Sequence, residues 1–123
     1  LGVGESARGL VLDGAGTVVD FAELARLAGD LYLLTTTAPI DRRLQVAARG
    51  FDVSLANVAR DVAALGVVGP KAREAASAAG FDVQGADLAA QGRVRGVELA
   101  VRPINFGAAP GLEIVYPADE ALT

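Results

Sequence analysis

Two carboxylates stand inside apolar stretches of the sequence, where they could do chemistry. Asp20 lies in "GAGTVVDFAEL" (14–24), and Glu113 lies in "GLEIVYP" (111–117), directly after a glycine-containing turn. Side chains alternate between the two faces of a strand, so each carboxylate can simply point to water. The alternative is that the fold holds it with polar partners, because burying an unpaired carboxylate is costly. The candidate partners are Arg26, Arg95 and Arg102.

Cysteine and histidine are both missing from the 123 residues. A cysteine nucleophile, a histidine base, a disulfide and a thiolate or imidazole metal site are therefore excluded for this chain, and we expect no metal. Any chemistry must use carboxylates, hydroxyls, backbone groups, Lys71 or arginine. The net charge of −4 argues against a nucleic-acid partner, because phosphate binding needs a basic surface.

The composition is that of a single domain covering residues 1–123. Hydrophobic residues make up 52% of the chain, which is enough for a packed core. No apolar run reaches the roughly 20 residues that a membrane helix needs. No signal peptide is apparent at the start. We therefore expect no membrane partner and a cytoplasmic location.

The first half of the sequence predicts a β-hairpin, a third strand and a helix. Residues 10–12 and 17–27 form the arms of the hairpin, because Asp13 to Gly16 supply turn residues. Residues 29–38 are rich in β-branched and apolar residues, which favours a strand. A helix is predicted over 38–50, opened by Pro39 and ended by Gly50; Ile40, Leu44 and Ala47 share one of its faces.

The second half predicts further strands around one alanine-rich helix. Residues 51–58 and 62–68 are expected as two short strands, and 70–80 as a helix ended by Gly80 and suited to close packing on a sheet. A polar loop over 81–91 precedes a final hairpin with strands at 93–106 and 111–117, and 118–123 resembles a first helical turn. The predicted fold class is α+β, an antiparallel sheet with two packed helices.

Three segments together resemble the folate-binding aminomethyltransferase superfamily, which includes the T protein of the glycine cleavage system and the dimethylglycine and sarcosine oxidases. They are "DGAGTVVDFAELARLAGDLYLLTTTAPIDRRL", "VARDVAALGVVGPKAREAA" and "ELAVRPINFGAAPGLEIVYPADEAL". The first segment is similar to the family's glycine turn, which is followed by two apolar residues and an Asp-Asp pair. The second is similar to a Gly-Pro-Lys-Ala segment of the family. The third is similar to a segment in which an Arg is followed by Gly-Glu and Phe-Glu. The resemblance implies the central part of the folate-binding domain, with tetrahydrofolate as cofactor.

The resemblance also assigns roles to residues. Asp20 matches the second Asp of the pair, which lies beside the reacting nitrogen of tetrahydrofolate, and would be the catalytic residue. Glu113 matches the Glu that grips the pterin ring, where a carboxylate accepts two N–H donors side by side. Asn105 or Phe106 falls where a tyrosine commonly lines the folate pocket. Leu24, Leu33, Leu34 and Phe106 either line that pocket or are plain core residues.

The sequence departs from the family pattern at several positions. Val19 replaces the first Asp of the pair, and Gly107-Ala108 replaces Gly-Glu. The chain also covers only the middle of the family's fold, so alone it forms a partial or minimal domain. Two functions stay open: folate-dependent transfer of an aminomethyl or methyl group, or a non-catalytic structural subunit similar to the small subunit of a sarcosine oxidase. The expected partners are accordingly a small folate, a partner chain or a second copy.

Overall fold

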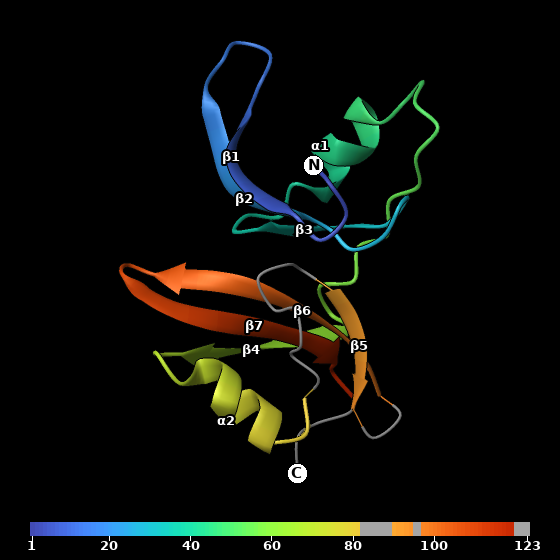
Figure 1. The fold of residues 1–123 in the computed structure, drawn as a ribbon. Helices are drawn as coiled ribbons and strands as arrows, with labels where there is room; N and C mark the ends of the chain where they lie inside the picture. Colours follow the sequence, from blue (N-terminus) through green and yellow to red (C-terminus); the bar gives the residue numbers. More distant parts are fainter. Residues whose placement is uncertain (82–89, 95–96, 120–123) are drawn as a thin grey trace.

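The computed structural model describes residues 1–81, 90–94 and 97–119, and within them the chain forms seven strands and two helices. The strands build two separate antiparallel sheets, one of three strands and one of four. The α+β class is therefore confirmed, but the expectation of one sheet is wrong. The two sheets lie one above the other in Figure 1, with helix α2 (Ala72–Ala78) beneath the lower sheet.

The three-stranded sheet is a simple meander in the order β1-β2-β3. Its strands are β1 (Ser6–Leu12), β2 (Val18–Arg26) and β3 (Tyr32–Thr36). The predicted hairpin turn is confirmed: Asp13 Oδ1 accepts hydrogen bonds from the amides of Ala15 and Thr17, each at 2.9 Å. Gly16 has a φ of 81°, a conformation that glycine adopts without steric cost. The turn thus sets the register of β1 against β2.

The four-stranded sheet has the order β4-β7-β6-β5. Its strands are β4 (Val62–Val68), β5 (Ala90–Val94), β6 (Val97–Phe106) and β7 (Ala109–Pro117). Two predictions are corrected here. The single strand expected over 93–106 is two strands, β5 and β6, which pair with each other. Residues 51–58, which the structure describes, form no strand, so the strand expected there is wrong. All of them are exposed and none pairs with a neighbouring strand, and an isolated strand without partners is not stable.

Helix α2 covers the face of the four-stranded sheet that carries the core. Ala72 and Ala76 are buried, and the core cluster is Ala76, Leu99, Val101, Leu112 and Ile114. The helix ends as predicted at Gly80, whose amide donates to Ser77 while the amide of Phe81 donates to Ala76. These two hydrogen bonds and the φ of 94° at Gly80 are those of a Schellman cap. The cap directs Phe81 onto the core.

Helix α1 (Asp41–Ala47) is anchored at its beginning rather than along its length. Ile40, directly before it, is 4% exposed, whereas none of the seven residues of α1, all of them described, is buried. Of the two helices expected to pack on a sheet, only α2 therefore buries residues. Neither helix within the described part of the chain is long and apolar enough to cross a membrane.

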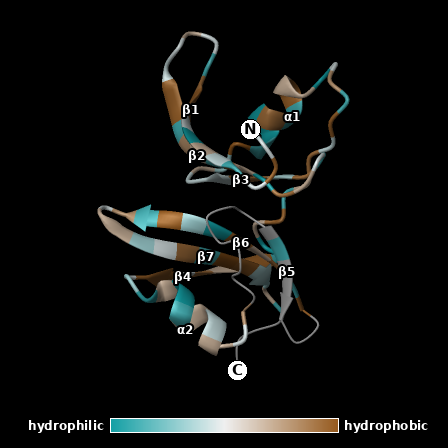
Figure 2. Ribbon diagram, in the orientation of Figure 1, coloured by the Kyte–Doolittle hydropathy of each residue, from teal (hydrophilic) through white to brown (hydrophobic). Residues whose placement is uncertain are grey.

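Apolar residues are not confined to the core between α2 and its sheet. Figure 2 shows hydrophobic stretches on the β1–β2 hairpin as well as along β7. Leu112 and Ile114 of β7 are fully buried, whereas Leu10 and Phe21 of the hairpin are 53% and 67% exposed. The two sheets thus differ in how completely they cover their apolar surface. Of the loop expected over 81–91, residues 82–89 lie outside the described residues, and residues 90 and 91 belong to strand β5 instead. The helical turn expected at 118–123 lies outside the described residues from residue 120 onwards.

Candidate functional site

Asp20 is buried in β2 and is held by the segment that leads from β3 into α1. It is 5% exposed. Its Oδ2 accepts hydrogen bonds from the amides of Thr37 and Ala38, both at 3.0 Å, and its Oδ1 accepts from the Thr37 hydroxyl and, at 2.8 Å, from the amide of Phe21. Both oxygens therefore have partners, and none of these is an arginine.

These hydrogen bonds keep the carboxylate ionised. The hydroxyl of Thr37 and then the amide of Ala38 lower the pKa of Asp20 below its ordinary value of 3.8, and desolvation opposes them only in part. A carboxylate that is charged at neutral pH is suited to fastening a loop to a strand. It is poorly suited to exchanging protons near neutral pH.

Glu113 is paired with Arg102 across the centre of the four-stranded sheet. The two residues are direct partners in the register of β6 and β7. The Nε of Arg102 donates a hydrogen bond to Oε2 of Glu113. The Arg102 side chain is only 6% exposed and that of Glu113 is 22% exposed. One of the three arginines expected to accompany a carboxylate is therefore found beside Glu113.

The same arginine also reaches the other sheet. Its Nη1 lies 3.1 Å from Oε1 of Glu23 on β2, and Glu23 is in turn 3.3 Å from the Nε of Arg8 on β1. We refer to Arg8, Glu23, Arg102 and Glu113 as the inter-sheet network. It carries two positive and two negative charges, so the buried guanidinium is electrically compensated.

The structure places Asp20 and Glu113 on different sides of the three-stranded sheet. Asp20 and Glu23 are three residues apart in a regular stretch of β2, so their side chains point to opposite faces. Glu23 faces the four-stranded sheet, because it meets Arg102 there. Asp20 therefore faces away from that sheet and from Glu113. The two carboxylates named by the sequence are not brought together.

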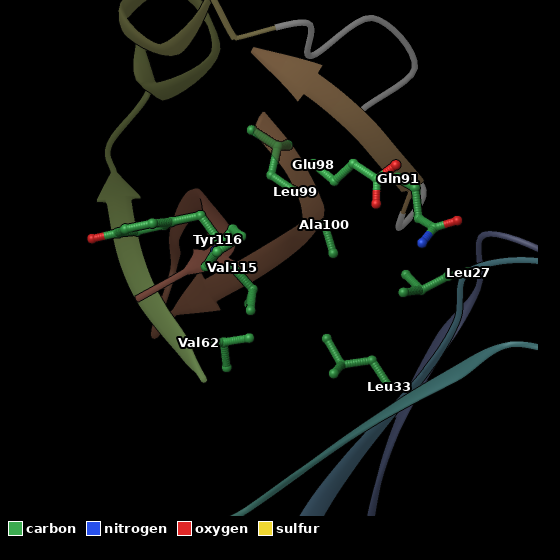
Figure 3. A pocket seen from close by; sticks show the side chains of 10 residues that line it. Leu27, Leu33, Val62, Gln91, Glu98, Leu99, Ala100, Val115 and Tyr116 are labelled. Carbon is green, nitrogen blue, oxygen red and sulfur yellow. The ribbon is translucent and has the colours of Figure 1, made fainter. Parts of the chain in front are cut away.

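The described residues line two open cavities between the sheets. The larger, of about 480 Å³, is lined by Leu27, Leu33, Val62, Gln91, Glu98, Leu99, Ala100, Val115, Tyr116 and Pro117 (Figure 3). The smaller, of about 310 Å³, is lined by Ser6, Ala7, Arg8, Glu23, Pro103, Ile104 and Asn105. The described lining of both cavities includes neither Asp20 nor Glu113.

The remaining predicted site residues are dispersed. Asn105 lines the smaller cavity and Leu33 the larger one. Leu24 is half-buried on the same face of β2 as Asp20, opposite Leu34 of β3. Phe106 is 67% exposed at the end of β6.

The other two candidate arginines have different outcomes. Arg26 donates to the backbone carbonyls of Leu1 and Gly29 and lies over the ring of Tyr32. Arg26 thus fastens the β2–β3 turn and the start of the chain. Arg95 lies outside the described residues.

Comparison of the chain with protein-family models, with curated proteins and with solved structures finds no significant match. The resemblance to the aminomethyltransferase superfamily therefore stays a prediction. Any functional proposal depends on the arrangement of the residues themselves.

The sequence reasoning missed Glu23. A second carboxylate in the same apolar strand, an odd number of residues from Asp20, was the signal that could have revealed it. Alternation requires the two side chains to face opposite sides of the strand, so they could not both belong to one site. This residue, rather than Asp20, connects to Arg102.

Proposed function

We propose that the chain is a non-catalytic structural subunit or scaffold that packs against a partner protein chain. The observation that carries this proposal is an exposed apolar patch on the β1–β2 hairpin. Its members are Leu10, Leu12, Val18 and Phe21, which we call the hairpin patch. They are between 50% and 67% exposed. Grouped apolar side chains of this kind are characteristic of surfaces that bind other proteins.

The register of the hairpin explains why these side chains gather. Leu10 pairs with Phe21 and Leu12 with Val18, and directly paired residues of an antiparallel ladder share a face. Leu10 and Leu12 are two residues apart and so share that face as well. The patch is thus one continuous surface formed from both strands.

The state of the carboxylates supports the same proposal. Asp20 is occupied by Thr37 and Ala38, and Glu113 by Arg102. Groups held in this way stabilise the fold, and using them in catalysis would require breaking several internal hydrogen bonds. A surface for a partner needs no such rearrangement.

The test is the association of the purified chain, followed by sedimentation velocity from micromolar to millimolar concentration. An obligate subunit without its partner is expected to self-associate through the hairpin patch. Phe21→Ser should abolish that association. Phe51→Ser is the matched control, since Phe51 is 72% exposed and lies outside the hairpin. A chain that stays monomeric throughout, or that is affected equally by the two variants, contradicts the proposal.

A second candidate is a folate-dependent one-carbon transfer domain, in which Asp20 acts near the reacting nitrogen and Glu113 holds the pterin. One observation favours it. Asn105, one of the two residues that the resemblance aligns with a tyrosine of the folate pocket, lines the smaller cavity together with Glu23. Glu23 belongs to the same inter-sheet network as Glu113. A pterin edge in this cavity would find the carboxylate of Glu23 and the amide of Asn105 in the same lining.

This second candidate is tested by thermal unfolding with and without 5-formyltetrahydrofolate, because a ligand that binds the folded state raises the unfolding temperature. Stabilisation should be lost in Asn105→Ala and kept in Gln91→Ala, which changes an exposed amide of the other cavity. A wild-type chain with no shift at saturating folate contradicts this candidate and leaves the partner-binding proposal unaffected.

A further inference from the structure

Strand β1 lies at an edge of the three-stranded sheet. Of the described residues, those of β2 alone form a strand ladder with it. An edge strand presents a row of N–H and C=O groups that have no ladder partner, and such a row is a template on which another strand can pair. The hairpin that carries this edge also carries the hairpin patch, and its turn projects away from the four-stranded sheet (Figure 1).

Two hydrogen bonds at the ends of the hairpin show which backbone groups of β1 point outward. At one end the amide of Arg26 donates to the carbonyl of Glu5 at 2.9 Å. At the other end the amide of Asp13 donates to the carbonyl of Thr17 at 2.9 Å. Opposite residues of an antiparallel pair alternate between bonded and non-bonded, and counting inward from either end gives the same result. The groups that point away from β2 belong to Ser6, Arg8, Leu10 and Leu12.

Strand β1 has few of the features that protect a free edge. It is seven residues long and contains no proline. Its one charged residue, Arg8, is already paired with Glu23 of the same chain. The extra residue of the irregularity in the hairpin is Val19 of β2, so β1 itself is regular along its length. Five of its seven residues are exposed, and the strand is therefore open to a second chain.

Two copies of β1 are complementary to each other when they run antiparallel. The outward groups all fall at even positions, so only registers that pair even positions with even positions form hydrogen bonds. The register centred on Gly9 is the one of these that pairs all seven residues. It places Arg8 opposite Leu10 of the second copy and Ser6 opposite Leu12. The two arginines are thus not direct partners, and each keeps its own glutamate.

This arrangement also joins the two hairpin patches. The twofold axis is perpendicular to the sheet, so equivalent faces of the two copies lie on the same side. Leu10 and Leu12 of both copies then meet at the seam of one continuous six-stranded sheet, with Phe21 beside them in β2. Removing these apolar side chains from water adds to the hydrogen bonds of the paired edges.

We propose that the chain pairs with a second copy of itself through β1, antiparallel and centred on Gly9. The two three-stranded sheets thereby become one. This inference rests on the function proposed above, because it specifies the partner of the hairpin and the way in which the two chains are joined. It uses no cavity and neither Asp20 nor Glu113.

The experiment measures hydrogen exchange of the backbone amides of the whole chain by NMR, from micromolar to millimolar concentration, with sedimentation velocity on the same samples. The amides of Arg8 and Leu10 should exchange about tenfold more slowly once about nine-tenths of the chain is associated, because exchange then occurs from the dissociated fraction. The amide of Gly9 is the internal control, since it points to β2 in both states.

The outcomes separate this inference from the function on which it rests. Association that leaves the amides of Arg8 and Leu10 unprotected overturns the pairing of β1 and leaves the hairpin patch as a surface for a partner. A chain that stays monomeric at every concentration contradicts the proposed function, and the pairing of β1 is overturned with it.

A cysteine variant examines the register directly, because the natural chain has no cysteine. Gly9 would form a non-bonded pair with Gly9 of the second copy, and such pairs have their Cα atoms about 4.5 Å apart, within reach of a disulfide. A Cβ at Gly9 meets nothing within 4 Å, so Gly9→Cys fits the fold. Mild oxidation should convert this variant into a disulfide-linked dimer.

Gly29→Cys is the matched control. Gly29 is also exposed and free of atoms within 4 Å of an added Cβ, but it lies between β2 and β3, away from the edge formed by β1. This variant should cross-link only slowly, through random collisions. Equal rates of cross-linking in the two variants overturn the register centred on Gly9.

Discussion

Arg102 and Glu113 are direct partners across β6 and β7, and the guanidinium of this pair extends beyond its own sheet to Glu23. A single buried side chain of β6 thereby connects its own strand to β7 in the same sheet and to β2, the central strand of the other sheet. Arg102 is therefore the cation that balances the negative charges of Glu23 and Glu113 between the sheets. It also gives Glu113 a structural role that requires no ligand.

Replacing Arg102 by methionine should destabilise the chain strongly. The change keeps most of the apolar stem but leaves Glu23 and Glu113 without their shared cation. Removing one partner of a buried pair costs about 3–5 kcal/mol, and the partial exposure of both glutamates reduces the expected loss here to about 2–4 kcal/mol. Urea unfolding of the wild type and the variant measures it.

Arg8→Met is the matched control for that experiment. Arg8 also pairs with Glu23, but its side chain is 65% exposed, and exposed ion pairs contribute at most about 1 kcal/mol. Equal losses in the two variants would show that burial of Arg102 has no energetic consequence, contrary to the structure.

Asp20 should make the stability of the chain depend on pH in the acid range. Its pKa is lowered in the folded state, so its contribution is complete above the unfolded value near 3.8 and is lost as the pH falls through the lower folded value. Unfolding free energies measured between pH 6 and pH 2 should therefore decrease towards acid. Asp20→Asn should be less stable near neutral pH and should show a flatter acid dependence.

Two companion variants identify the cause of that pH dependence. Thr37→Val removes the hydroxyl donor, which is the largest cause of the lowered pKa, and should shift the loss of stability to higher pH. Asp30→Asn removes an exposed carboxylate and controls for the change in net charge. A wild-type profile that coincides with that of Asp20→Asn would rule out the role given to this carboxylate.

Gly111 of β7 should not tolerate a side chain. A Cβ at this position would lie 2.7 Å from the carbonyl oxygen of Val67, a backbone atom of the neighbouring strand that cannot move aside by rotation. Gly111→Ala is expected to cost about 1–3 kcal/mol, the usual effect of overpacking. Gly66→Ala is the control in the same sheet, because its Cβ would meet only the Ile104 side chain at 3.9 Å. Thermal unfolding should show a larger loss of stability for Gly111→Ala than for Gly66→Ala.

Local features of the fold could be predicted from the sequence, whereas strand partners could not. Asp13 and Gly16 determine the first hairpin through their own turn chemistry, and Gly80 determines the end of α2. The choice of β7 as the partner of β4 depends on residues far apart in the chain, and local pattern carries no information about it. For the same reason the division into two sheets, and the separation of β5 from β6, were not predicted.

The contacts of the candidate site, like the fold, could be predicted from the sequence only in part. The sequence left open whether Asp20 and Glu113 point to water or are held by polar partners; the structure shows partners for both, and Arg102 was among the candidates. The partner of Asp20 is instead Thr37, whose position depends on how the chain leaves β3. The pairing of Glu23 with Arg102 depends on the two sheets facing each other, which the sequence did not predict. Long-range placement, rather than residue type, decided these contacts.

The central claim is that Glu113 and Asp20 hold the fold together and that the chain works as a structural unit. Calorimetric titration of the wild type and of Glu113→Gln with 5-formyltetrahydrofolate tests it most directly. The account predicts no saturable heat for either protein, together with a lower unfolding temperature for the variant. Micromolar binding by the wild type that disappears in Glu113→Gln would contradict it and would make the folate-dependent transfer domain the better description.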